Sequence, residues 1–528
     1  MTPILSAPSI WSIRLDITNL DVKISIEGDG CFLIEGVSGR TISWSSMGKM
    51  QPFMFIDAYQ ASIVAPGGYV FPIYFRKIGQ SLFFSNVASM LIRQGDVLKI
   101  NTSVLLQNLT GTPTPRSNIF KDILLLEASA KYLATASGLS RIGTALSESR
   151  GVNADAALDI VFNEWNSYLS SGRDVAVLLS GGYDSRLNLA IACNAAKRYG
   201  NKILAFHEYK NKYEESIAIQ VANAANIELI IRGREDFVSN EHSVILDPKF
   251  INIQSGFYRR NIIRWHSYLT YINSIMPNCI IMGMGAEAHK GKYYNQIDSV
   301  ESDCQRVFGL DTRRTDYIYK KFKINNYYSE SEKLYFQSLF EFASEFNTLD
   351  SKVDYIHYQT YIANGYGFRC HDFHLYFNIE FPFLDNRFLA AVFSLPRKEK
   401  EGFALVLKGI DRLMPLFNNI QYTSANEKSL RPIKRTYFHD VKAKIMGIIR
   451  PIQLRILPPR KKNRLSLTNS ERDYLMSLSP RSKVVKVLVE NALKFDGSVP
   501  FLNLVCLVQI SLYLEQVERV HSAELLFD

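Results

Sequence analysis

A short apolar run that ends in a Ser-Gly-Gly turn constrains this chain more than any other segment. Residues 175–179 are aliphatic or β-branched, and Ser180 and two glycines follow them directly. A helical pattern then begins, and further short apolar runs alternate with helical segments. Alternation of this kind indicates βαβ units and a parallel sheet. We therefore predict an α/β fold in which residues 175–179 are the first strand.

Other segments extend the same pattern on both sides of this turn. The predicted strands are residues 203–206, 227–231 and 279–282, and the predicted helices include residues 154–169 and 214–225. Ligands of open parallel sheets bind beyond the carboxyl ends of the strands. The turn after residue 179 falls at such an end, so we expect the binding site there.

The residues of this turn suit an anionic ligand. They are Ser180, Gly181, Gly182, Tyr183, Asp184 and Ser185. The glycines let the backbone approach a ligand closely, and the N–H groups at the start of the next helix favour negative charge. A carboxylate such as that of Asp184 belongs beside phosphates when magnesium bridges the two. The alternative is a Gly-rich turn closed by a capping serine, and the pattern is neither a Walker A loop nor GxGxxG.

The regions on either side differ from this segment in composition. Residues 1–125 are rich in β-branched and aromatic residues, with predicted strands at 22–26, 69–75 and 81–84 and a loop at 111–118. From about residue 310 onward, Tyr, Phe and Leu recur at helical spacing. We predict a small, mostly β domain at 1–150, an α/β domain at 151–440 and a helical extension at 441–528.

Charge and cysteine content narrow the class of protein. The net charge of +10 fits an anionic ligand or an acidic partner, or a basic surface without a specific role. The late basic clusters lack interleaved aromatic residues, so we expect no nucleic acid partner. Six widely spaced cysteines form no CxxC pair, which disfavours a zinc site or a disulfide framework and indicates a reducing compartment. We find no signal-peptide pattern, and polar residues interrupt the apolar stretch 499–514, so we expect a cytoplasmic protein without a membrane partner.

Residues 180–185 resemble the pyrophosphate loop of the N-type ATP pyrophosphatases, the PP-loop superfamily. Within it, residues 150–430 resemble the asparagine synthetase family, which includes β-lactam synthetases and lasso-peptide cyclases. Matching segments follow in the family's order: residues 214–222 resemble the helix after the second strand, 279–293 its GxGxDExxxGY loop, and 380–385 its PFLD segment. Ser394-Leu-Pro396 and the basic helix at 408–415 follow at the expected distances.

The resemblance implies an adenine nucleotide α-hydrolase-like parallel sheet with a helical C-terminal part, and ATP and Mg²⁺ as cofactors. It implies that pyrophosphate is bound by Ser180, Gly181, Gly182, Asp184 and Ser185. Asp184 and Glu287 would hold magnesium and act in catalysis, although the family usually has Asp at the position of Glu287. These two carboxylates are therefore the expected metal ligands.

The resemblance also implies an adenosine side of the site. Backbone groups of Leu178 and Leu179 would hold the adenosine, together with His207 at the end of the second strand, and Gly283 would approach the nucleotide. A surface histidine at a strand end is the alternative for His207. We interpret Asp385 of the PFLD segment as a helix cap.

Three departures from the family's pattern bear on the reaction. Thr2 stands where the family's glutaminase domain has its cysteine, so residues 1–150 resemble a degenerate version of that mostly β, N-terminal-nucleophile type of domain. Met284 replaces an acidic residue of the second loop. The family lysine that follows Leu-Pro has no counterpart in register, and Lys428 is the nearest candidate for a catalytic role, with a solvated loop charge as the alternative.

Two functions are consistent with this pattern. The first is an AMP-forming carbon–nitrogen ligase that adenylates a carboxylate with ATP and passes it to an amine without hydrolysing glutamine. Its partners would be small-molecule or peptide carboxylates and amines, and a homodimer stays open as the assembly state. The second is a catalytically weakened relative that binds nucleotide and serves as a scaffold for another protein.

Overall fold

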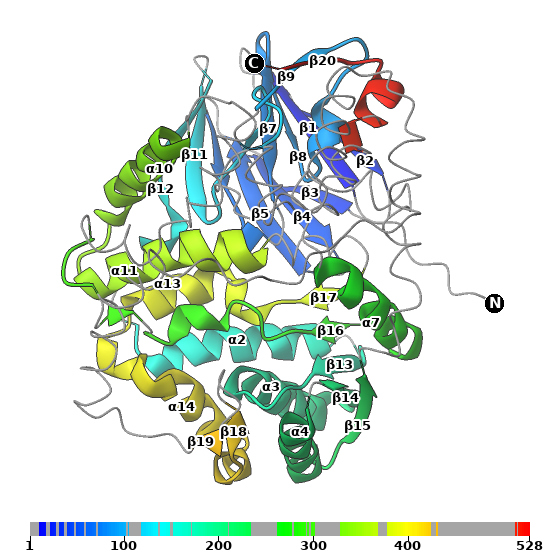
Figure 1. Cartoon of the computed structure of the whole chain (residues 1–528), viewed down its shortest axis with the longest axis vertical. Helices are drawn as coiled ribbons and strands as arrows, with labels where there is room; N and C mark the ends of the chain where they lie inside the picture. The colour runs from blue at the N-terminus through cyan, green and yellow to red at the C-terminus, as the bar shows by residue number, and fades with distance from the viewer. Residues whose placement is uncertain are drawn as a thin grey trace, which may run out of the picture.

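The computed structural model divides the chain into an N-terminal β part and a mixed α/β part (Figure 1). It describes most of residues 10–104, 118–233, 261–300, 328–367 and 377–423, together with 429–430 and 513–527, with short gaps inside several of these ranges. The β strands of the first part occupy one end of the molecule and the parallel sheet the other, with helices between them. The predicted α/β class is therefore confirmed in its coarse form.

Two antiparallel sheets form the N-terminal part. The first has the order β10-β7-β8-β1-β2 and the second the order β12-β11-β6-β5-β4-β3. Their strands are β1 (Ile10–Asp16), β2 (Val22–Glu27), β3 (Cys31–Glu35), β4 (Arg40–Ser46), β5 (Lys49–Ile56), β6 (Ala61–Val64), β7 (Tyr74–Ile78), β8 (Ser81–Ser85), β10 (Leu124–Leu125), β11 (Ala130–Thr135) and β12 (Gly138–Thr144). Side chains of both sheets, among them Leu15, Leu82, Met54 and Ile63, share one buried apolar cluster. The sheets therefore pack face to face.

The predicted strand at residues 69–75 is wrong over most of its described length. Tyr69 ends the 3₁₀ turn η1 (Gly67–Tyr69), residues 72 and 73 belong to no strand, and β7 begins at Tyr74. Gly68 has a φ of +66°, which turns the backbone out of an extended path. Pro72 cannot donate to a sheet ladder, which also delays the strand. The predicted strands at 22–26 and 81–84 correspond to β2 and β8.

A five-stranded parallel sheet forms the centre of the second part. Its order is β15-β14-β13-β16-β17, and every neighbouring pair is parallel. The strands are β13 (Val175–Leu178), β14 (Ile203–Tyr209), β15 (Glu228–Gly233), β16 (Ile280–Ile281) and β17 (Ile379–Glu380). Strands β13, β14 and β15 follow one another toward one edge of the sheet, whereas β16 pairs with the other side of β13 and β17 continues toward the opposite edge. The strand order therefore reverses between β13 and β16.

Helices cover this sheet and link it to the β part. They are α2 (Ala154–Leu169), α3 (Tyr183–Tyr199), α4 (Lys212–Ala225), α7 (Asn261–Ile275), α10 (Tyr328–Ala343), α11 (Leu349–His357), α13 (Asn386–Ser394) and α14 (Ala404–Leu413), with a π-helical continuation of α11 at Tyr358–Gly367. Polar side chains define several helix starts: Asn153 accepts from the Ala156 N–H at 2.9 Å, and Asn211 accepts from the Glu214 N–H at 2.8 Å. The two helices predicted from sequence match α2 and α4.

The end of the described chain returns to the N-terminal part. Strand β20 (Glu524–Phe527) pairs in parallel with β9 (Val97–Ile100). The residues of the predicted extension at 441–512, the loop at 111–117 and most of the stretch 499–514 lie outside the described residues. A small antiparallel pair, β18 (Tyr422–Thr423) and β19 (Ser429–Leu430), follows α14.

A single apolar cluster runs from the β part into the parallel sheet. It includes Leu98 and Phe120 of the first part, Val177 and Phe206 of the sheet, and Leu525 of β20. Burial of this continuous surface holds the parts together. Within the described residues, we find no helix that combines the length and the apolar character needed to cross a membrane.

Candidate active site

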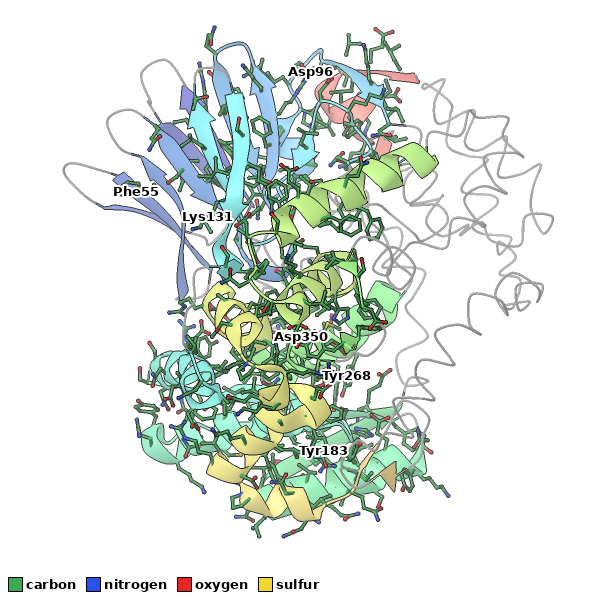
Figure 2. All side chains as sticks on the ribbon, turned by 90° about the vertical axis from the view of Figure 1, so that its left-hand side faces the viewer. Phe55, Asp96, Lys131, Tyr183, Tyr268 and Asp350 are labelled. Carbon is green, nitrogen blue, oxygen red and sulfur yellow. The ribbon has the colours of Figure 1, made fainter. Side chains whose placement is uncertain are left out.

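The reversal of strand order places two loops side by side at one edge of the sheet. In open parallel sheets, the crevice at such a reversal is the usual place for a ligand. The loop after β13 contains Ser180 and leads into α3, while the loop after β16 contains Gly283 and leads into the 3₁₀ turn η5 (Ala286–His289). A methyl group at Gly283 would contact Asp184 and Ser185, so the two loops touch. In the side view, Tyr183 at the start of α3 lies at the end of the molecule away from Asp96 of the β part (Figure 2).

Hydrogen bonds within the first loop fix the two serines. The Ser180 N–H donates to Ser185 Oγ at 3.0 Å, and the two hydroxyl oxygens lie 3.0 Å apart. The Gly182 N–H donates to Ser180 Oγ at 3.2 Å. Helix α3 starts after Gly182, which offers no side-chain cap to the first N–H groups of the helix. An uncapped start of a long helix is a favourable position for an anion.

A carboxylate already lies beside this loop. Glu214, in the first turn of α4, accepts a long hydrogen bond of 3.5 Å from the Gly181 N–H. This contact shows that the loop amide faces an oxygen ligand from outside the loop. A phosphate oxygen would make the same type of contact, and it would compete with Glu214 for the Gly181 N–H.

Arg186 anchors the first loop to the segment after α14. Its side chain is fully buried, and its guanidinium donates to the carbonyl of Gly181 at 3.2 Å and to that of Ile420 at 2.8 Å. It also donates to the carbonyls of Phe417 and Gln421. Burial lowers the pKa of Arg186 to about 10. Arg186 was not among the predicted site residues, although its place directly after Ser185 could have indicated an anchor for the loop.

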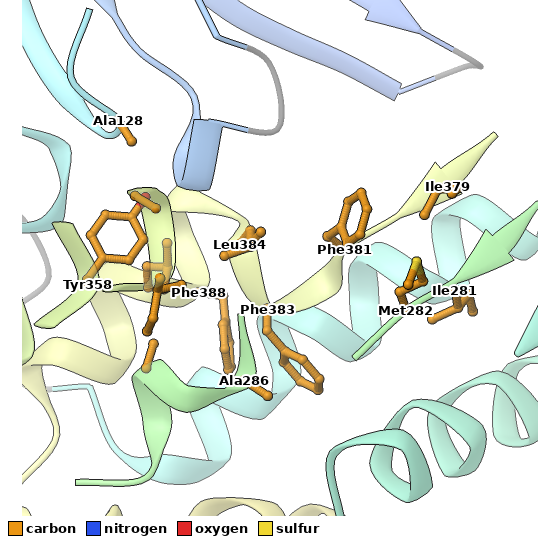
Figure 3. Packing of buried hydrophobic residues seen from close by; sticks show 14 of the residues in the cluster. Ala128, Ile281, Met282, Ala286, Tyr358, Ile379, Phe381, Phe383, Leu384 and Phe388 are labelled. Atoms are coloured by element: carbon orange, nitrogen blue, oxygen red, sulfur yellow. The ribbon is translucent and has the colours of Figure 1, made fainter. Parts of the chain in front are cut away.

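The second loop brings a carboxylate and a lysine to Asp184. Gly285 has a φ of +89°, and a methyl group there would lie 2.3 Å from Leu384 Cδ2, so only glycine fits this turn. The following turn η5 carries Glu287, and Lys290 caps its end. Figure 3 shows Ala286 of this turn beside Phe383 of the segment after β17.

The ammonium of Lys290 links the two predicted metal ligands. Lys290 Nζ lies 2.6 Å from Asp184 Oδ2 and 3.9 Å from Glu287 Oε1. The neighbouring His289 Nε2 is 3.5 Å from Asp184 Oδ1, too long for a well-formed hydrogen bond. Lys290 was not among the predicted site residues. Its spacing of three residues after Glu287 is the signal that could have indicated it, because a 3₁₀ turn places positions i and i+3 on one side.

The charges of this group shift the pKa values of Asp184 and Lys290. Burial alone would raise the pKa of Asp184, but the positive charge of Lys290 and the contact with His289 outweigh it, and the net shift is downward. Burial would lower the pKa of Lys290, but Asp184 and Glu287 more than reverse this effect, so its pKa is raised. Asp184 is therefore an anion and Lys290 a cation throughout the neutral pH range.

Residues predicted for the adenosine side lie next to the first loop. The Leu179 N–H donates to the Phe206 carbonyl at 2.8 Å, and the Leu179 carbonyl lies 2.9 Å from His207 Nδ1. His207 is buried, so the alternative of a surface histidine at a strand end is wrong. Leu178 ends β13 and is half-buried. The N–H and the carbonyl of Leu179 are thus both hydrogen-bonded within the protein.

Two further predicted residues have different outcomes. Asp385 accepts hydrogen bonds from the N–H groups of Arg387 and Phe388 at 2.8 and 3.3 Å, which confirms that it caps α13. Lys428 lies outside the described residues. Met284 lies half-buried in the second loop, where it supplies no acid.

The described residues contain no group of three or more His, Cys, Asp and Glu side chains arranged to hold a metal. Asp184 and Glu287, the two predicted metal ligands, therefore belong to no such larger group in the part of the chain that the structure describes. No protein-family model matches the chain, and a search of curated proteins finds no match either. The geometry of the two loops thus carries the functional argument.

Proposed function

We propose that this chain is an ATP-dependent, AMP-forming carbon–nitrogen ligase of the asparagine synthetase-like type, which activates a carboxylate and transfers it to an amine. The observation that carries this proposal is the convergence of an uncapped helix start, two serines and two carboxylates at the reversal of a parallel sheet. On this proposal, the α/β part is a PP-loop domain and the two antiparallel sheets are a degenerate glutaminase-like domain. Two buried cysteines that form no disulfide, Cys193 and Cys279, support a reducing, cytoplasmic setting.

The first loop would bind the pyrophosphate portion of ATP. The first N–H groups of α3 would donate to the phosphates, and the Ser180 and Ser185 hydroxyls would turn from their partners within the loop to donate to phosphate oxygens. Fixed donors of this kind stabilise the charge that develops on the leaving pyrophosphate as a substrate carboxylate attacks the α-phosphorus. An amine then attacks the acyl group and releases AMP. Holding both reactants at one sheet edge supplies much of the rate.

The carboxylates of Asp184 and Glu287 fit a magnesium ion. The ammonium of Lys290 lies 2.6 Å from Asp184 Oδ2 and 3.9 Å from Glu287 Oε1, which supports a shared cation position beside the two carboxylates. Magnesium commonly uses one or two carboxylates and takes its other ligands from phosphates and water. When bound there, it would neutralise phosphate charge. Asp184 and Glu287 are the residues that would hold it.

ATP binding and pyrophosphate release test this function directly. We expect ATP with Mg²⁺ to raise the melting temperature of the chain, and a set of carboxylates and amines to elicit AMP and pyrophosphate, measured by mass spectrometry. Asp184→Asn should lower pyrophosphate release about 100- to 1000-fold, because it removes a charge from the phosphate site. Asp155→Asn is the matched control, since Asp155 pairs with Lys408 on the exposed surface and should leave the rate unchanged.

A second candidate is a nucleotide-binding scaffold without catalysis. The ammonium between Asp184 and Glu287 favours it, because this cation occupies the metal position. ATP binding without AMP formation, in every carboxylate and amine combination, would support the scaffold over the ligase. Absence of ATP binding would reject both candidates.

A further inference from the structure

The position between Asp184 and Glu287 is filled by a side chain of the protein itself. Lys290 Nζ makes a short, charge-assisted contact of 2.6 Å with Asp184 Oδ2 and lies 3.9 Å from Glu287 Oε1. The three side chains are each about one-fifth to one-quarter exposed, at 18%, 22% and 26% for Lys290, Asp184 and Glu287. The three side chains are thus shielded from most of the solvent but not fully buried.

Buried polar groups around this position lack the partners that such groups normally have. His289 is fully buried, and neither of its ring nitrogens has a hydrogen-bond partner in the described part of the chain, although Nε2 lies 3.5 Å from Asp184. The amide of buried Asn188, next to Gly283, is unpartnered at both of its atoms. Buried polar atoms without partners are rare in native proteins. A polar ligand or water in this region would supply their missing partners.

An aromatic ring also lies near the ammonium of Lys290. Its Nζ lies 5.6 Å from the centre of the Phe403 ring, within the range of a cation–π contact. Phe403 has a φ of +67°, an uncommon conformation for a bulky residue, and its ring packs against Tyr183 at 5.5 Å. The structure therefore holds the lysine by two carboxylates and one ring.

We propose that Lys290 is a tethered cation that occupies the divalent-metal position of the nucleotide-free chain, so that a metal ion binds Asp184 and Glu287 only by displacing it. This inference rests on the proposed function, because it concerns the metal of that same site. One ammonium and one divalent ion cannot both lie between the two carboxylates, since like charges at that separation repel strongly. The apparent metal affinity of the nucleotide-free chain is therefore the intrinsic affinity multiplied by the fraction of molecules in which Lys290 has left the position.

The test measures Mn²⁺ binding by the full, nucleotide-free chain with electron paramagnetic resonance. Lys290→Gln removes the competing charge and should tighten Mn²⁺ binding roughly 10- to 100-fold, the range expected for loss of one hydrogen bond between charged groups. Lys408→Gln is the matched control, because Lys408 makes an ion pair of 2.7 Å with Asp155 on the exposed surface. It should leave Mn²⁺ affinity unchanged.

A double variant locates the gain. Adding Asp184→Asn to Lys290→Gln should abolish the tighter binding if the ion uses the vacated position. Unchanged or weaker Mn²⁺ binding by a folded Lys290→Gln chain overturns the proposal, and so does tighter binding that persists in the double variant. If Lys290→Gln fails to fold, as judged by circular dichroism, Lys290→Met replaces it in the same comparison.

The assay also separates this inference from the proposed function, because it contains no nucleotide. If Lys290→Gln binds Mn²⁺ more tightly but the wild type does not bind ATP, the ligase function is rejected, while the competition between Lys290 and the metal ion stands. If the wild type releases pyrophosphate from ATP but Lys290→Gln leaves the Mn²⁺ affinity unchanged, the competition between Lys290 and the metal ion is rejected, while the ligase function stands.

Discussion

Arg186 is the residue whose side chain joins the first loop to the rest of the structure. Its guanidinium donates to four carbonyls, of Gly181, Phe417, Ile420 and Gln421, and the side chain is fully buried. Lysine has three donors on a single nitrogen and cannot reproduce this fork. We expect Arg186→Lys to lower the free energy of unfolding by about 2–3 kcal/mol, because buried carbonyls lose their donors. Urea unfolding monitored by circular dichroism measures this change.

The matched control for this prediction is Arg198→Lys. Arg198 lies in the exposed last turn of the same helix, so its change should stay within about 0.5 kcal/mol. Equal effects of the two substitutions would show that the buried fork adds nothing specific. The Arg186→Lys chain should also bind ATP more weakly than wild type if the proposed function holds, since Gly181 belongs to the loop that the fork anchors.

Single residues show where sequence reasoning reaches its limit. The prediction of Asp184 followed from its place in a Ser/Gly loop, and that of Asp385 from capping chemistry that depends on neighbours two and three residues away. The contact of Lys290 with Asp184 joins residues 106 positions apart, and no local pattern contains it. Arg186 is similar, because its partners at 417–421 become neighbours only after folding. The cap formed by Asp385 was predictable from local chemistry; the spacing of Lys290 after Glu287 could have placed it near that carboxylate, but not its contact with Asp184.

At the scale of elements, predictions succeeded where a segment's own residues determine its structure. Helix α2 matches the predicted range because Asn153 caps its start and apolar residues recur along one face. Strand β13 follows from a run of buried apolar residues. The error at residues 69–75 arose because the left-handed backbone of Gly68 and the missing N–H of Pro72 override the β-forming side chains around them.

Strand β20 offers a pH-dependent prediction at this scale. His521 precedes it, and its carbonyl accepts from the Gly95 N–H at 2.8 Å. Burial lowers the pKa of His521, and the charge of Asp96 offsets this only in part. Because the pKa of His521 is lower in the folded chain, its contribution to stability is complete above its unfolded pKa of about 6.5. This contribution is lost as the pH falls through the lower, folded pKa. We expect amide exchange protection at 524–527, corrected for intrinsic rates, to be lower at an acidic pH well below about 6.5 than at a pH above it.

Two comparisons check this expectation. Protection of β13 in the same samples should not change over that pH range, since β13 is buried in the core far from His521 along the chain. In His521→Gln, β20 should keep the same protection at both pH values. Loss of protection that is equally pH-dependent in the variant would assign the effect to another group.

At the scale of the whole molecule, Leu384 connects the β part to the candidate site. Methyl groups at Gly68 and at Gly285 would each clash with its side chain, at 2.8 Å from Cδ1 and 2.3 Å from Cδ2. Gly68 belongs to the β part and Gly285 to the second site loop, so one side chain packs against both, and Figure 3 shows it between these segments. The Gly68 N–H also donates to the buried Tyr358 hydroxyl. The N-terminal part therefore supports the loop that carries Glu287.

Gly68→Ala tests this support against Gly79→Ala. Both glycines have a left-handed backbone, with φ of +66° and +58°, but a methyl group at Gly79 would meet nothing within 4 Å. Gly79→Ala should therefore cost only the backbone strain, about 1–2 kcal/mol, while Gly68→Ala should cost about 2 kcal/mol more because it overpacks Leu384. Calorimetric unfolding measures both. Since the apolar cluster is continuous across the parts, we expect a single unfolding transition. In Gly68→Ala, but not in Gly79→Ala, ATP should raise the melting temperature less than in the wild type. Equal losses of stability and of this ATP effect in the two variants would show that Leu384 does not couple the β part to the site.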